Sequence, residues 1–114
     1  MKTQTHKSKI HKSEISWSKQ AAHYKRVFLL GESDMLKISI KRDSYDFQSY
    51  ARLSRWDGKQ WNLVSEIPYS KMNAVKDGTN IKPRNGNEVD FRDACKPDVE
   101  QLLKDAEFIL DIED

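Results

Sequence analysis

The sequence has few of the residues that build covalent or metal-held frameworks. Cys95 is its only cysteine, so no disulfide can form within one chain, and a zinc site built from several cysteines is excluded. Three prolines and four glycines in 114 residues leave room for regular elements. We therefore expect one domain held together by a hydrophobic core, in the reducing cytoplasm.

Long hydrophobic runs are also missing. The longest apolar run covers residues 27–30, far below the roughly 18 to 20 residues that a membrane-spanning helix needs. After Met1, the first 14 residues contain one apolar side chain, that of Ile10. The hydrophobic stretch of a secretory signal is therefore not found there, and we expect a cytoplasmic protein with no membrane partner.

Charge is abundant and unevenly distributed. Residues 1–30 contain seven bases and one acid, residues 31–84 ten bases and seven acids, and residues 85–114 three bases and ten acids. The formal net charge of +2 thus combines a basic start with an acidic end. Two interpretations stay open: the basic start contacts an anionic partner, or it lies against the acidic end of its own chain.

The N-terminal third is predicted to hold an arm and a helix. Residues 1–15 are mostly Lys, Ser, Thr and His, and ordering them would cost roughly 1–2 kcal/mol per residue with little apolar burial in return. We predict a disordered basic arm there. Over 16–30 the apolar positions recur at spacings of three and four, and Gly31 follows, which predicts a helix. The alternative is a helix that ends near Arg26, followed by a short buried strand over 27–30.

The middle of the chain carries the pattern of an antiparallel meander. Residues 36–41 alternate between apolar and polar, and further strands are predicted over 47–56 and 60–67. An Asp-Gly pair separates the last two. If Leu53 lies opposite Leu63 on the apolar face, the hairpin between them has a three-residue loop.

The segment that follows has few apolar residues. We predict a short turn over 70–75 and a long surface loop over 76–92. Ile81, Val89 and Phe91 either anchor this loop or form a fourth strand.

The chain is predicted to end in an amphipathic helix that begins at Pro97, with Asp98 and Glu100 near its positive end. Phe108 and Ile112 fall outside the apolar stripe of this helix, and they either cover the edge of the sheet or form a protein interface. The stripe consists of Val99, Leu102, Leu103, Ala106, Ile109 and Leu110.

These elements define an α+β fold. We expect a three-stranded, or four-stranded, antiparallel meander with an N-terminal helix and a C-terminal helix packed on one of its faces. Residues 16–114 would form this single domain, and residues 1–15 would precede it as the arm.

The polar face of the predicted sheet is the best candidate for a binding site. Cations there would contact phosphates and aromatic rings would stack on bases, as in platforms for single-stranded nucleic acid. We therefore expect a small non-catalytic protein that engages nucleic acid through this face and the basic arm. The face consists of Lys37, Lys41, Tyr50, Arg52 and Trp56.

Two other interpretations remain. These side chains can instead be an ordinary solvated surface. The protein can also be a protein-interaction module, such as a small inhibitor or adaptor, that uses Trp56, Tyr50 or the Phe108 and Ile112 flank, with a homodimer as one form of that interaction.

No pattern of catalysis or of cofactor binding is present. Two of the three histidines, His6 and His11, lie in the predicted arm, where no general base would be held in position. Asp46 and the later Asp57-Gly58-Lys59 resemble in outline the Asp…Asp-x-Lys arrangement of metal-dependent nucleases, but the second group falls in the predicted hairpin loop. We expect no enzyme activity, no metal and no cofactor.

Overall fold

The computed structural model describes the backbone of residues 4–76 and 89–113, and the side chains of residues 12–76 and 91–108. In these residues six strands form one sheet in the order β5-β4-β3-β2-β1-β6. Strands β1 to β5 form an antiparallel meander, and β6 pairs with β1 in parallel. The strands are β1 (Gln4–Trp17), β2 (Ala21–Leu29), β3 (Met35–Asp43), β4 (Tyr50–Trp56), β5 (Trp61–Ile67) and β6 (Phe108–Glu113).

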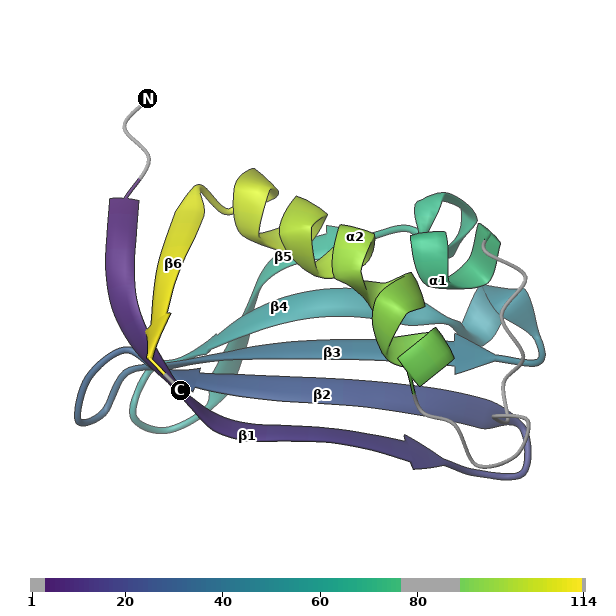
Figure 1. Ribbon diagram of the computed structural model, residues 1–114, viewed down its shortest axis with the longest axis horizontal. Coiled ribbons are helices and arrows are strands. Elements are labelled where there is room, and N and C mark those ends of the chain that lie inside the picture. Colours follow the sequence, from purple (N-terminus) through teal and green to yellow (C-terminus); the bar gives the residue numbers. More distant parts are fainter. Residues whose placement is uncertain (1–3, 77–88, 114) are drawn as a thin grey trace.

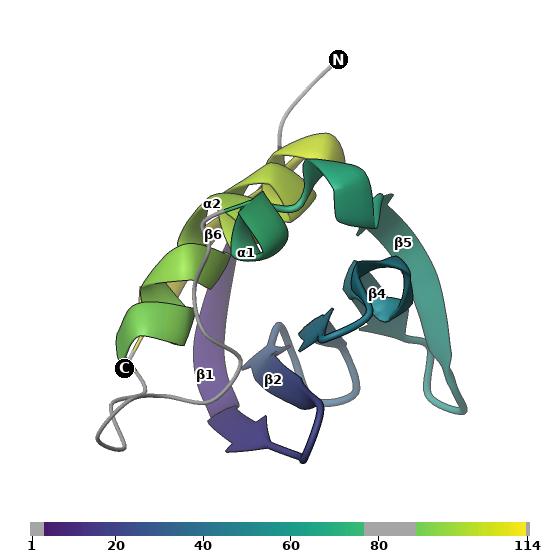
Figure 2. The ribbon, with the colours of Figure 1, turned by 90° about the vertical axis from the view of Figure 1, so that its right-hand side faces the viewer.

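The helices lie on one side of this curved sheet (Figures 1 and 2). The long helix α2 (Val89–Asp105) runs diagonally across it, next to the short α1 (Asn73–Lys76). Two single-turn 3-10 helices, η1 (Asp46–Gln48) and η2 (Tyr69–Lys71), precede β4 and α1. Among the described residues, no helix has the length and apolar character needed to cross a membrane.

The central strand β3 determines which face of the sheet is buried. Leu36, Ile38 and Ile40 are fully buried on the face toward α2, and full burial of such side chains stabilises a fold by about 1.5–3 kcal/mol each. Their neighbours in the ladders, among them Phe28 and Leu53, belong to the same core. Because side chains alternate along a strand, the residues between them point to the opposite face, which we call the outer face.

The predictions for the N-terminal third are wrong. Residues 16–30 form no helix, because they belong to the end of β1 and to β2. The predicted disordered arm is a strand from Gln4 onward, and residues 1–3 lie outside the described part. Pairing with both β2 and β6 supplies backbone hydrogen bonds that help to offset the ordering cost of this segment. The alternative of a buried strand over 27–30 is closer, since β2 includes Val27 to Leu29.

The three strands predicted in the middle correspond to β3, β4 and β5, but the sheet has six strands, not three or four. The predicted pairing of Leu53 with Leu63 is also wrong. A bulge follows Leu53, so Leu53 pairs with Ser65, and Ser54 pairs with Leu63. Leu63 therefore lies on the outer face and is 58% exposed. The hairpin loop has four residues, 57–60, because the first pair joins Trp56 and Trp61.

The C-terminal helix exists and packs on one face as predicted, but its limits differ. It begins at Val89, so Pro97 lies inside it. Val89 and Phe91 consequently belong to α2 and form no fourth strand, while Ile81 lies outside the described residues. Glu107 has a φ of 60°, a left-handed conformation of the kind that ends helices. The chain then forms β6, which contains the last two residues of the predicted stripe.

Asp98 joins α2 to α1. Its carboxylate accepts hydrogen bonds from the backbone N–H groups of Asn73, at 2.7 Å, and Ala74, at 2.9 Å. The Asn73 side-chain Nδ2 donates in return to the carbonyl oxygen of Ala94 at 2.9 Å. Asp98 is only 3% exposed, and burial raises the pKa of its carboxyl although the two backbone hydrogen bonds oppose this shift. The neighbouring Cys95 is fully buried, and burial together with Asp98 raises the pKa of its thiol.

We expect the Asp98→Asn variant to be less stable by about 1–3 kcal/mol, because the two backbone N–H groups bond to different oxygens of Asp98 and in asparagine one of these positions is an NH2 donor that leaves its N–H unpaired. Urea unfolding measures this loss. The matched control is Asp105→Asn, an exposed position on the same helix. An equal effect of the two substitutions would contradict the structural role of Asp98.

The same variant tests a pH dependence. Because the folded-state pKa of Asp98 is raised above the ordinary value of about 3.9, the folded chain holds this proton more tightly than the unfolded chain does. Ionisation of Asp98 therefore lowers stability as the pH rises from about 3.9 through the folded pKa. This component should be missing from the unfolding curves of Asp98→Asn.

Candidate nucleic-acid interface

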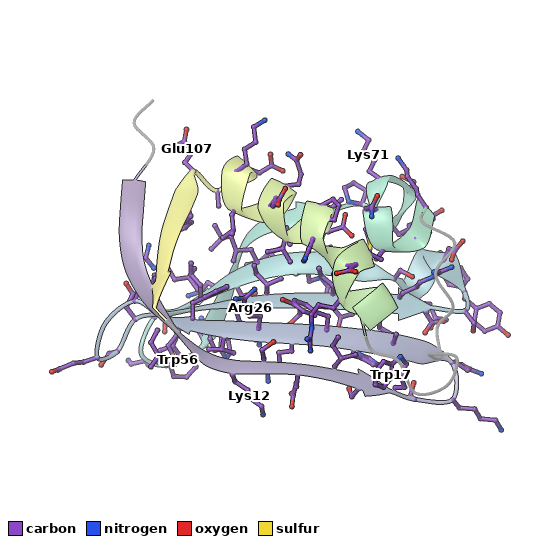
Figure 3. All side chains as sticks on the ribbon, viewed as in Figure 1. Lys12, Trp17, Arg26, Trp56, Lys71 and Glu107 are labelled. Atoms are coloured by element: carbon purple, nitrogen blue, oxygen red, sulfur yellow. The ribbon has the colours of Figure 1, made fainter. Side chains whose placement is uncertain are left out.

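The outer face brings together all five residues predicted for nucleic-acid binding. Lys37 and Lys41 point outward from β3, and their ladder partners on β4 are Ser54 and Tyr50. Ser39, between the two lysines, pairs with Arg52. Trp56 is on the same phase of β4. The side chains of Lys12 and Trp56 lie on the side of the sheet away from α2, whereas those of Lys71 and Glu107 lie on the helix side (Figure 3).

The cations of this face contact its aromatic rings. The Arg52 guanidinium carbon lies 4.3 Å from the centre of the Tyr50 ring, and Lys37 Nζ lies 4.5 Å from the centre of the Trp61 ring. Trp61 in turn packs against Trp56, with ring centres 5.5 Å apart. Such cation–π contacts stabilise by about 0.5–1 kcal/mol at exposed sites, and they hold cations and rings together on the outer face.

Carboxylates neutralise part of this charge. Arg52 Nε donates to Glu66 at 2.8 Å, Lys41 Nζ lies 3.4 Å from buried Asp43, and Lys12 Nζ lies 3.5 Å from Glu14. In the part of the chain that the structure describes, Lys25 and Lys37 have no ion pair. They point outward from the adjacent strands β2 and β3, and burial together with Lys25 lowers the pKa of Lys37. This pair gives the face its excess of positive charge.

A shallow hollow of about 280 Å³ lies on the outer face between β1 and β4. The small side chains of Ser16 and Ser39 contribute to it, because they leave space beside the larger Tyr50. The other outward-pointing residues of its lining are Glu14, His23 and Lys25. Burial and the charge of Lys41 lower the pKa of His23, while Asp43 opposes the shift, so the hollow is lined by an imidazole that favours its neutral form.

Sequence reasoning missed Trp61, Lys25, Lys12 and His23 as members of this face. Lys12 lies in the predicted arm, and His23 and Lys25 lie in the predicted helix. The sequence pattern therefore does not predict that these three side chains point outward from a sheet. Trp61 was placed on the core face with Leu63, and the bulge after Leu53 moves both outward. If the Asp57-Gly58 turn is assigned a four-residue loop, Trp56 and Trp61 become partners, and this assignment would have found Trp61.

The predicted interface at Phe108 and Ile112 is not the flank of a helix, because both residues belong to β6. Phe108 is half-buried and packs against the core, with the Arg55 guanidinium carbon 5.7 Å from its ring centre. Arg55 also forms a bidentate ion pair with Asp34 at 2.7 and 3.0 Å. The backbone of Ile112 pairs with that of Ser8; its side chain lies outside the described ones.

The structure gives Asp57 a role in the turn. Its carboxylate accepts hydrogen bonds from the N–H groups of Lys59 and Gln60 and from Asn62 Nδ2, and these bonds lower its pKa. Its neighbour Gly58 has a φ of 100°, which favours glycine. Within the described side chains, no group of three or more His, Cys, Asp or Glu residues is placed to hold a metal ion.

Comparisons with protein-family models, with curated proteins and with solved structures find no match to this chain.

We expect His23 to titrate below the ordinary histidine pKa of about 6.5 in an NMR titration. Because its folded-state pKa is lowered, the unfolded chain binds more protons in this interval, so stability increases as the pH rises toward about 6.5. Lys41→Gln should raise the pKa of His23 part of the way, since burial contributes more than Lys41 does. The control is Lys59→Gln in the hairpin loop; a His23 pKa that is equal in both variants would contradict this electrostatic contact.

Proposed function

We propose that this protein is a non-catalytic binding protein that engages single-stranded nucleic acid through the outer face. The observation that carries the proposal is the convergence of Lys37, Tyr50, Arg52, Trp56 and Trp61 on one open surface, with cations placed over rings. Phosphate neutralisation supplies most of the affinity of non-specific binding, and stacking on aromatic rings adds about 1–3 kcal/mol per base.

The position of the helices supports the same proposal. Helices α1 and α2 cover the opposite face of the sheet (Figure 2), so an extended strand can lie across β2, β3 and β4 without displacing an element. Positive charge without an ion pair is centred on Lys25 and Lys37, and Lys37 lies over the Trp61 ring. The free arm of the sequence-based hypothesis has no part in this proposal, because residues 4–17 are a strand of the sheet. A buried, unpaired Cys95 suits a reducing cytoplasmic compartment.

A second candidate function, a protein-interaction module, is favoured by a different surface. The exposed large hydrophobic side chains lie on β5, on η2 and in the segment 45–47, which overlaps η1. Leu63 and Val64 are 58% and 42% exposed on β5, which is a terminal strand in the order of the described sheet. An edge strand with exposed apolar side chains is a template for pairing with another strand. Tyr45, Phe47 and Tyr69 are the remaining exposed members of this set.

The nucleic-acid proposal is tested by fluorescence anisotropy with a labelled single-stranded oligonucleotide between about 50 and 200 mM salt. The test variant combines Lys25→Gln and Lys37→Gln. The matched control combines Lys71→Gln and Lys104→Gln, which removes the same charge from exposed positions outside this face. Each lost phosphate contact reduces the slope of log K against log salt by about 0.7 on single strands, so we expect a reduction of up to about 1.4 in the test variant only.

Stacking is tested in the same assay with Tyr50→Leu, which should weaken binding by roughly 5- to 150-fold. Its aromatic control is Phe47→Leu, which removes an exposed ring outside the outer face. No binding at the lowest salt concentration would refute the proposal. Equal effects of the two lysine variants would show binding by net charge alone, and equal effects of Tyr50→Leu and Phe47→Leu would contradict stacking on this face.

The second candidate predicts a homodimer in which β5 pairs with β5 of a second copy. Sedimentation equilibrium over a range of concentrations should then show a monomer–dimer equilibrium that Val64→Lys shifts to monomer, because charge on an edge strand opposes pairing. Ser70→Lys, at an exposed position beyond β5, is the control. A monomer at every concentration would contradict this edge as a self-association site.

A further inference from the structure

A second cationic site lies on the helix side of the sheet, between β2 and α2. It is a pocket of about 220 Å³, below the roughly 300–1,000 Å³ of pockets that hold drug-sized ligands. Tyr24 and Arg26 contribute to it from β2, on the face opposite to Lys25. The rest of its lining comes from α2 and consists of Arg92, Lys96, Val99 and Glu100.

The helix side of this pocket follows from helical spacing. Arg92, Lys96 and Glu100 are four residues apart, so their side chains share one face of α2. Apart from Arg92, which has contacts of its own, the pocket sets the two cations Arg26 and Lys96 against the carboxylate of Glu100. Lys96 Nζ lies 3.5 Å from Asp93, but both side chains are well exposed, at 69% and 57%, and such surface pairs contribute little. The pocket therefore has a positive excess that suits an anion.

Arg26 provides the strongest indication of a ligand. It lies in β2 opposite Ile38 of β3 and Ser13 of β1, and its guanidinium carbon is 5.0 Å from the centre of the Phe28 ring. Its Nε is buried and has no hydrogen-bond partner. Buried donors without a partner are rare in native proteins, and the acceptors of the described residues do not complete the hydrogen bonding of this guanidinium.

We propose that this pocket binds a small doubly charged oxyanion, in particular a phosphoryl group. Guanidinium groups match phosphate oxygens in geometry as well as in charge, and the limited volume favours a small phosphate compound over a nucleotide. The Tyr24 ring and Val99 give the pocket an apolar wall, and Glu100 offers an acceptor for a hydroxyl group of the ligand. The site is on the other side of the sheet from the outer face, so it does not depend on the nucleic-acid proposal.

The test is an NMR titration of the full chain with inorganic phosphate, at an ionic strength kept constant with sodium chloride. We expect saturable shifts in the amide signals of residues 24–26 and 92–100. Arg26→Gln and Lys96→Gln should each weaken phosphate binding by roughly tenfold, as expected for loss of one hydrogen bond to a charged group. Lys96 is exposed, so its substitution keeps the test valid if Arg26→Gln lowers stability.

The matched control is Lys104→Gln, which removes the same charge from an exposed position of α2 outside the pocket. It should leave the affinity unchanged, as should the combined Lys25→Gln and Lys37→Gln variant. Phosphate-saturated protein should also bind an oligonucleotide as tightly as phosphate-free protein does in the same ionic strength. Shifts that do not saturate, shifts on the outer face, or equal affinities in the Lys96→Gln and Lys104→Gln variants would overturn the proposal.

Discussion

The burial of Leu36, Ile38 and Ile40 beneath α2 is the constraint on which the rest of this structure depends. These three side chains occupy every second position of the central strand, so their burial fixes the direction of each residue between them. Lys37, Ser39 and Lys41 must then face away from the helix. The cationic outer face is in this sense a geometric consequence of the core, and a shift of the register by one residue would exchange the two faces.

The sequence pattern predicts this central region well, because apolar and polar residues alternate along a strand that has one buried face. The alternation in residues 36–41 was sufficient to assign β3 and to place Lys37 and Lys41 on one surface with Tyr50 and Arg52. In the hairpin that follows, the alternation does not predict the pairing. A single bulge after Leu53 changes the phase of the partner strand, and alternation alone does not reveal at which residue the bulge occurs.

The errors at the two ends of the chain have another cause. In β2, the core positions Tyr24 and Phe28 are four residues apart, a spacing that fits one helix face and also alternate positions of a strand. Buried residues occur on both faces of this strand, since Ala21 and Val27 are buried as well, and this obscures its alternation. Residues 21–29 form a strand because they pair with β1 and β3. Likewise β6 is a strand because β1 is beside it, a partner about one hundred residues away in the sequence.

That parallel pairing also bears on a question that the charge distribution left open. Lys7 and Lys9 of β1 lie in register with Asp111 and Glu113 of β6, so the basic start of the chain lies along its acidic end. These two segments meet at an edge of the sheet, away from the strands β2 and β3 that hold Lys25 and Lys37.

Consecutive residues of β2 point to opposite faces of the sheet. Lys25 points outward beside Lys37, whereas Arg26 points inward to the pocket beneath α2. The sheet between them separates the two positive regions, so an anion on one face does not block the other sterically. Occupancy of one face should therefore leave binding at the other face unchanged.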